Sequence, residues 1–297
     1  VEREVKRIIT PGTLTDENLL DEGQDNILLS ISSGKKSGYG LAILDLSAGF
    51  LKVNEVNTHH ELLSELERIK PKEILLSEIS SLREELKSIA CQQTLTAWHF
   101  DYKIAYQKLL VHFQVKDLKG FGCDDLTLGI EACGALLQYV YNTQKSQLPH
   151  LKNLKKEHIS ECILIDPQTR KNLEITENLQ GTKKNTLFSV INKTANPMGT
   201  RLLSRWLNRP LKDRNILKAR QDAIAEYLKN ESFTPLSPML KDIGDIERIQ
   251  SRIALASAKP KDLTGLSHAL QILPKLKRML AGTTSDFLQS QHQSLKT

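Results

Sequence analysis

Between residues 26 and 56, hydrophobic residues are grouped into three short segments that glycine-containing turns separate. The segments are Asn26–Ser33, Tyr39–Leu46 and Phe50–Val56, and hairpin-like distances lie between them. We therefore predict three β-strands that follow one another as a meander. From residue 59 onward many apolar residues recur every three or four positions, which indicates amphipathic helices.

Helices and strands alternate as far as residue 141. We predict helices over residues 59–68, 81–90, 102–113 and 126–141, and strands over residues 73–77 and 94–100. Beyond residue 154 one further strand is predicted, at 162–166. In the rest of the chain the apolar residues have helical spacing, and proline and glycine separate the segments. We predict helices over residues 186–192, 198–208, 216–228, 246–256 and 263–281. The predicted fold class is an α/β domain followed by an all-α region.

The clearest helix lies between Pro197 and Pro210. Proline needs no N–H group in the first helical turn, so Pro197 suits the start, and Pro210 ends the helix. The apolar positions, spaced by three or four, are Met198, Leu202, Leu203, Trp206 and Leu207. Three arginines lie four residues apart: Arg201, Arg205 and Arg209. The pattern predicts a packed helix with a solvated, charged face.

This segment resembles a signature of the MutS family of DNA mismatch-repair proteins. The pattern is Asn-Pro-Met-Gly-x-Arg-x-Leu-x-x-Trp-Leu-x-x-Pro-Leu, and its family positions here include Pro197, Met198, Gly199, Arg201, Leu203, Trp206, Leu207 and Pro210. Other blocks resemble the family in the same order along the chain, at residues 7–13, 117–122, 136–139, 166–175, 245–249 and 259–263. The chain is identified on these motifs as a MutS homologue.

The resemblance implies a domain organisation and a function. Residues 1–23 would be a linker from a mismatch-binding domain, residues 24–152 a ribonuclease H-like connector domain, and residues 153–297 an incomplete helical core, or lever, domain. The full-length protein would be a homodimeric ATPase that binds mismatched DNA, exchanges ADP for ATP with Mg²⁺, and recruits MutL. This region would couple the mismatch-binding and ATPase parts.

The resemblance also places a MutL contact on the predicted helix 102–113. Gln107 and Lys108 align with that contact. The family often has Gln-Gln there, so Lys108 departs from the family pattern. A solvated helix face is the alternative interpretation of both residues.

Two chemical motifs of the family are missing from this sequence. No phenylalanine is followed two residues later by glutamate, the pattern of the mismatch reader, and there is no Gly-x-x-x-x-Gly-Lys-Ser/Thr P-loop. The nearest match, Gly34-Lys35-Lys36-Ser37, has Leu29 in place of the first glycine and is predicted to be a hairpin turn. We expect an internal piece of a MutS protein, with no cofactor and no catalytic activity of its own.

A ribonuclease H-like fold also raises a catalytic hypothesis, because nucleases of that fold hold two divalent metals between carboxylates. Asp45 ends the second predicted strand, and Glu78 or Asp101 could add oxygen ligands. The alternative for Asp45 is a turn residue whose carboxylate accepts backbone N–H groups. The second hypothesis for the chain is therefore a stand-alone ribonuclease H-like nuclease or nucleic-acid-binding protein with a basic helical tail.

Charge is divided unevenly between the two halves. Residues 1–150 contain 16 Lys and Arg against 21 Asp and Glu, whereas residues 151–297 contain 25 against 14. The basic half predicts weak, non-specific association with DNA, and lysines that solvate long helices are the alternative. Aromatic residues make up only 5% of the chain, which argues against a base-stacking platform.

The remaining side chains with possible chemistry form no recognisable site. No cysteine pair has Cys-x-x-Cys spacing and no histidine lies at zinc-ligand spacing, so we expect buried thiols in a reducing compartment. The cysteines are Cys91, Cys123, Cys133 and Cys162. Trp98 and Trp206 are expected in the core. No apolar run reaches the ~20 residues that span a bilayer, and no signal peptide is visible, which predicts a cytoplasmic protein without a membrane partner.

Overall fold

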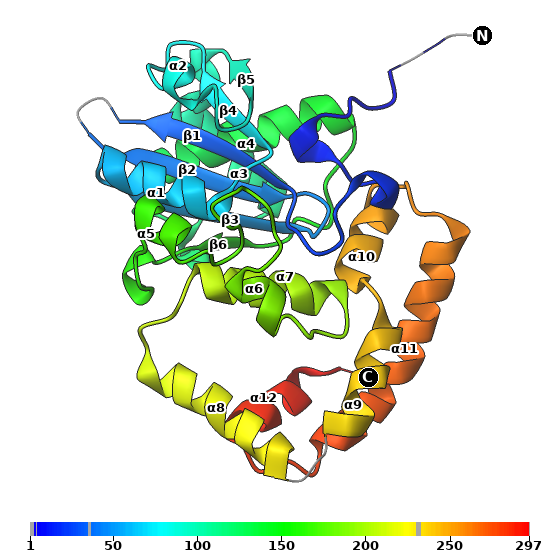
Figure 1. Cartoon of the computed structure of the whole chain (residues 1–297). Coiled ribbons are helices and arrows are strands. Elements are labelled where there is room, and N and C mark those ends of the chain that lie inside the picture. Colours follow the sequence, from blue (N-terminus) through cyan, green and yellow to red (C-terminus); the bar gives the residue numbers. More distant parts are fainter. Residues whose placement is uncertain (1–2, 4, 35–36, 230–232, 297) are drawn as a thin grey trace. The chain divides into compact units, whose positions relative to one another are not determined.

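The computed structural model describes residues 3, 5–34, 37–229 and 233–296, and the chain divides into two compact units (Figure 1). Unit 1 comprises residues 1–159, 165–169 and 250–257. Unit 2 comprises residues 160–164, 170–249 and 258–297. The predicted turn at Lys35 and Lys36 lies outside the described residues, although Gly34 N–H donates to the Gly38 carbonyl at 2.9 Å beside it.

Unit 1 is built on a six-stranded mixed sheet with the order β5-β4-β1-β2-β3-β6. The first three strands pair antiparallel, whereas β4 is parallel to β1, β5 to β4 and β6 to β3. The strands are β1 (Ile27–Ser33), β2 (Tyr39–Asp45), β3 (Phe50–Val56), β4 (Glu73–Ser77), β5 (Cys91–Leu95) and β6 (Leu154–Lys156).

Helices cover both faces of this sheet (Figure 1). They are α1 (His59–Ile69), α2 (Arg83–Leu86), α3 (Tyr102–Phe113) and α4 (Thr127–Gln144). Because successive strand residues point to opposite faces, Leu28 packs with α3 and α4, and Leu29 packs with α1 and α2. Both are fully buried, which explains why β1 begins with three consecutive apolar residues, Ile27 to Leu29.

Glycines let α4 pack very closely against its neighbours. A Cβ atom added to Gly134 would lie 2.3 Å from the Cβ atom of Ala105 in α3. One added to Gly40 in β2 would lie 2.0 Å from the backbone carbonyl carbon of Leu128 in α4. Any side chain at these two positions would therefore push α4 away from α3 or from the sheet.

The chain is helical after Asp166 in all its described regular elements. The helices are α5 (Pro167–Asn172), α6 (Leu187–Ile191), α7 (Pro197–Asn208), α8 (Arg214–Lys229), α9 (Phe233–Ile243), α10 (Ile246–Ala254), α11 (Pro260–Leu280) and α12 (Asp286–Ser294). The buried clusters of unit 2 are small and lie between α9 and α11 and around α8 and α12. None of the helices within the described residues has the length and apolar character needed to cross a bilayer.

The predicted α/β region followed by a helical region is confirmed, but two predicted strands are wrong. The strand expected at 94–100 lies at Cys91–Leu95, because pairing with β4 fixes its position, and residues 97–100 form the short 3-10 helix η3. The strand expected at 162–166 is reduced to a single bridge between Cys162 and Leu211. Pro167 begins α5 directly afterwards, which leaves no room for a longer ladder.

All four cysteines are free thiols. Three of them are buried, as predicted, but Cys91 is exposed because it opens β5 at the edge of the sheet. Burial raises the pKa of the Cys123 thiol to about 11, and it raises that of Cys133 further. These two side chains therefore behave as small apolar core residues.

Candidate partner-binding site

Helix α3 has one buried side and one exposed side. Asp101 caps the helix, since its carboxylate accepts the Ile104 N–H at 3.1 Å. Ala105 and Leu109 are fully buried in the cluster shared with α4 and the sheet. The exposed residues of the helix are Lys103, Ile104, Gln107 and Val111. We call the surface formed by these four residues together with Lys108 and Trp98 the α3 face.

Gln107 and Lys108, the two residues aligned with a partner contact, are in different environments. Gln107 is exposed, whereas Lys108 is half-buried, and this burial lowers the pKa of its ammonium group. No carboxylate of the described residues lies within ion-pairing distance of Lys108. The pKa of His99 is lowered by burial and then by the charge of Lys108.

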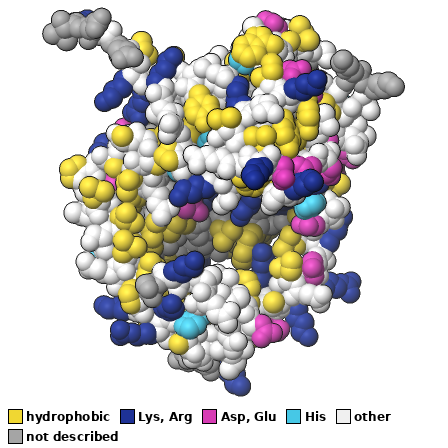
Figure 2. Space-filling model, turned by 180° about the vertical axis from the view of Figure 1, so that it is seen from behind, with side chains coloured by type: hydrophobic (Ala, Val, Ile, Leu, Met, Phe, Trp, Pro, Cys, Tyr) yellow, Lys and Arg dark blue, Asp and Glu magenta, His cyan; other side chains and the backbone are white. Residues whose placement is uncertain are grey.

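Trp98 extends the α3 face, and the expectation that it lies in the core is wrong. Its side chain is 55% exposed, and its ring lies over His99 with 3.6 Å between ring centroids. The chain turns here because the Asp101 N–H donates to the Trp98 carbonyl at 3.2 Å. Seen from behind, the side on which α3 and α4 lie, hydrophobic side chains reach the surface among Lys and Arg (Figure 2).

Asp45 is a fully buried turn residue. Its Oδ1 atom accepts the Ala48 N–H at 2.9 Å and the Ser47 hydroxyl at 2.7 Å, and its Oδ2 atom accepts the Asn26 N–H at 2.8 Å. Burial raises the pKa of this carboxyl group, although the three hydrogen bonds oppose the shift. The turn interpretation of Asp45 agrees with this geometry.

The two other carboxylates considered for metal binding also accept backbone N–H groups. Glu78 accepts the N–H of Ala97 at 3.2 Å, and Asp101 caps α3. Within the described residues no group of three or more His, Cys, Asp and Glu side chains could hold a metal ion. The structure thus assigns all three carboxylates to turns and caps.

A buried carboxylate that no sequence pattern had indicated fastens the N-terminal segment to the sheet. Glu73 in β4 is fully buried and accepts three hydrogen bonds, from the Thr10 hydroxyl (2.6 Å), the Gly12 N–H (2.8 Å) and the Tyr139 hydroxyl (2.6 Å). A Cβ atom on Gly12 would lie 2.9 Å from the Glu73 Cβ atom. The one available signal was an acidic residue beginning an otherwise apolar strand.

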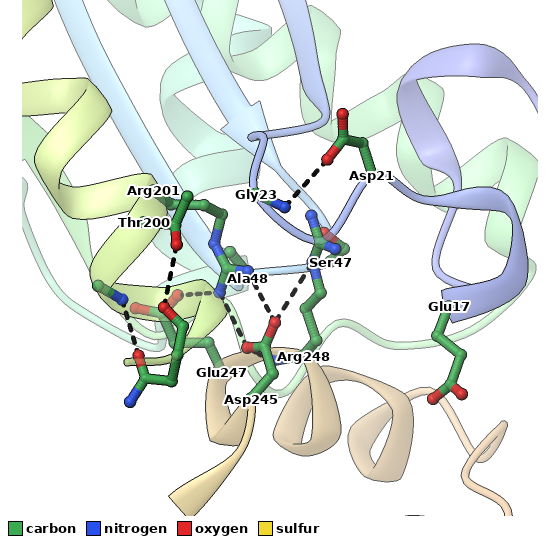
Figure 3. A network of polar contacts seen from close by, with 12 residues as sticks. Glu17, Asp21, Gly23, Ser47, Ala48, Thr200, Arg201, Asp245, Glu247 and Arg248 are labelled. Carbon is green, nitrogen blue, oxygen red and sulfur yellow. Dashed lines mark hydrogen bonds and ion pairs between the residues drawn. The ribbon is translucent and has the colours of Figure 1, made fainter. Parts of the chain in front are cut away.

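In unit 2, the motif helix α7 begins at Pro197 as predicted, but its charged face is not solvated throughout. Asn196 precedes Pro197 and accepts the N–H of Gly199 at 2.9 Å. Arg201 is fully buried and makes two hydrogen bonds to Asp245, at 2.7 and 2.8 Å, and one to Glu247 at 2.7 Å (Figure 3). These carboxylates raise the pKa of Arg201 despite its burial. The prediction of a solvated Arg201 is therefore wrong, because two carboxylates satisfy it.

The other motif residues pack only in part. Met198 contacts the small cluster between α9 and α11. Trp206, expected in the core, is 39% exposed, and the Arg220 guanidinium lies 3.7 Å from its ring centroid. The partly buried positions are Leu203, Leu207 and Pro210. The motif thus carries contacts that hold helices together.

Comparison with known families gives two matches in chain order. The model of MutS domain II matches residues 26–152, and the model of MutS domain III matches residues 168–297. The first match contains α3 and the first five strands, and the second contains α7 and its carboxylate partners.

Proposed function

We propose, from the premise that this chain belongs to the MutS family, that it forms the connector and core region of a DNA mismatch-repair protein and couples mismatch binding to ATP turnover. In that role the sheet domain offers a docking surface to MutL, and the helical region transmits force as levers. The sheet order β5-β4-β1-β2-β3-β6 supports a ribonuclease H-like connector. No other candidate function has a comparable observation in its favour.

The exposed side of α3 is the observation that carries the docking role. Ile104 and Val111 are exposed apolar side chains on either side of Gln107. Residues three and four apart share one helix face, so these three form a continuous stripe. Apolar side chains with polar neighbours at the surface are typical of protein-binding sites.

The lever role is supported by the way α7 is held. Arg201 joins α7 to Asp245 and Glu247 at the start of α10, with three charged hydrogen bonds. A buried, bidentate arginine resists sliding between helices, because any shift leaves its charge unpaired. Rigid connections of this kind suit a region that transmits a conformational change.

The proposal gives this region no chemistry of its own. ATP, ADP and Mg²⁺ would bind to a P-loop elsewhere in the full-length protein, since the sequence contains none. The full-length protein would act in the cytoplasm as a homodimer on mismatched DNA. The basic second half would add weak, salt-sensitive attraction to DNA without recognising a mispair.

A MutL binding assay tests the proposal. Val111→Asp places a charge on the apolar stripe and should weaken binding of MutL to this chain at least tenfold, equivalent to about 1.4 kcal/mol. Lys87→Glu is the control, because Lys87 is an exposed lysine next to α2, which packs on the other face of the sheet. Equal binding by wild type and Val111→Asp, with both proteins folded, would refute docking on α3.

A further inference from the structure

The α3 face differs in charge from the rest of its half of the chain. Residues 1–150 contain more acidic than basic side chains. Between Ala97 and Phe113, however, the single carboxylate is that of Asp101, and it already accepts the Ile104 N–H. Lys103 and Lys108 lie in the same stretch. The α3 face as defined therefore carries two lysines and no carboxylate of its own.

Lys108 holds the central position of this area. It is four residues after Ile104 and three before Val111, so the three side chains share one side of the helix. Its charge also lowers the pKa of His99, over which the exposed Trp98 ring lies. Lys108 is half-buried, which reduces its contact with water, and no acidic side chain of the described residues pairs with it. A charge in this state gains free energy when an anion reaches it.

We propose that the α3 face receives an acidic, apolar patch of MutL, in which an apolar side chain packs on Ile104 and Val111 and a carboxylate pairs with Lys108. This inference rests on the proposed function, because it names the chemistry of the surface that docks there. Complementary charge sets partner choice and encounter rate, whereas the apolar contacts supply most of the affinity. The Gln-Gln of other family members would place no such charge requirement on the partner.

Calorimetric titration of MutL into the full chain at low and high salt tests the charge requirement. Lys108→Glu should weaken binding about tenfold or more, since the partner carboxylate would then meet a like charge. Lys108→Met keeps the length and apolar contact of the side chain. It should weaken binding less and remove part of the salt dependence of the dissociation constant. Lys87→Glu should bind as wild type, and thermal melting should show that every variant is folded.

A charge-swap screen identifies the partner residue. Single Asp→Lys and Glu→Lys variants of MutL are tested against Lys108→Glu, and at least one should restore its binding while weakening that of the wild type. If Val111→Asp has no effect, docking on α3 fails altogether. If Val111→Asp abolishes binding while Lys108→Glu binds as wild type, docking stands and the acidic partner is refuted. If Lys108→Glu weakens self-association of this chain instead, the partner is a second copy and the inference is also refuted.

Discussion

The sheet unit and the helical unit bury different kinds of side chain. In unit 1 most fully buried side chains are aliphatic, and they lie on both faces of the sheet, for example Leu44 on one face and Ile74 on the other. In unit 2 the largest fully buried side chain is that of Arg201. Unit 2 also leaves apolar residues of α8 in solvent, with Ile224 at 58% and Leu228 at 62% exposure.

This difference has a physical origin. In a sheet that is covered on both faces, successive side chains of each strand point into two different cores. Burial is therefore spread over many residues. Packed helices bury only one stripe of side chains each, so their core is smaller. A few polar contacts must then fix how the helices pack. Stability in unit 1 should therefore be widely distributed, whereas in unit 2 it should depend on a few residues.

Removing Arg201 tests that dependence and should have the largest effect. Arg201→Ala leaves Asp245 and Glu247 without their main cation and should cost about 3–5 kcal/mol of unfolding free energy. Hydrogen exchange should quicken in α7 and at the start of α10, while β1 and β2 stay protected. Arg214→Ala, at the exposed start of α8, is the control. Equal loss of protection in both units would contradict the comparison.

The Glu73 cluster is a buried polar cluster in unit 1, and Tyr139→Phe tests its contribution. The substitution removes one of three donors to a fully buried carboxylate and should cost about 1–3 kcal/mol. Exchange should quicken at Thr10 and Gly12, which the same carboxylate holds. Tyr106→Phe, in α3, is the matched control, because its hydroxyl makes no hydrogen bond within the described residues. Unchanged exchange at residues 8–13 would show that the segment is held by other contacts.

The smallest expected effect comes from His150, a titratable group of unit 1. Burial lowers its pKa to about 4, from an ordinary value near 6.5. The folded state therefore favours neutral His150, and this stability is present above pH 6.5 and lost as the pH falls towards 4. The free energy of unfolding should drop by about 1 kcal/mol between pH 6.5 and 5.5.

Denaturant titrations of wild type and His150→Gln at these two pH values measure that contribution. Asp45 affects stability in the opposite direction to His150. Its pKa is raised in the folded state, so it stabilises the folded state as the pH falls. Subtracting the pH dependence of the variant's unfolding free energy from that of wild type removes the contribution of Asp45 and leaves that of His150. An identical pH dependence in both would mean that His150 does not titrate as its burial requires.

Local pattern alone was enough where an element is long or bounded by strong signals. Helix α3 was predicted with its observed ends, Tyr102 and Phe113, from the spacing of its apolar residues. The three-stranded meander was predicted to within one residue at each end. The start of α7 was predicted from Pro197, because proline fits the first helical turn without an N–H group.

Positions that depend on distant partners could not be predicted in this way. The strand β6 has the sequence Leu-Lys-Lys and forms because β3 offers a free edge to Leu154–Lys156. The sequence located the candidate site only in part. The family resemblance gave Gln107 and Lys108, but the exposure of Trp98 follows from a turn that the spacing of apolar residues does not reveal.

The sequence by itself determined the family, the order of most elements, and the helix that presents Gln107 and Lys108. Only the tertiary structure decided which charges are buried. It placed Arg201 between two carboxylates from residues 245–247, and it gave Lys108 no carboxylate partner among the residues that the structure describes. The reason is that periodicity reports which side of a helix faces inward, whereas the state of a charge depends on groups that are distant in sequence and near in space.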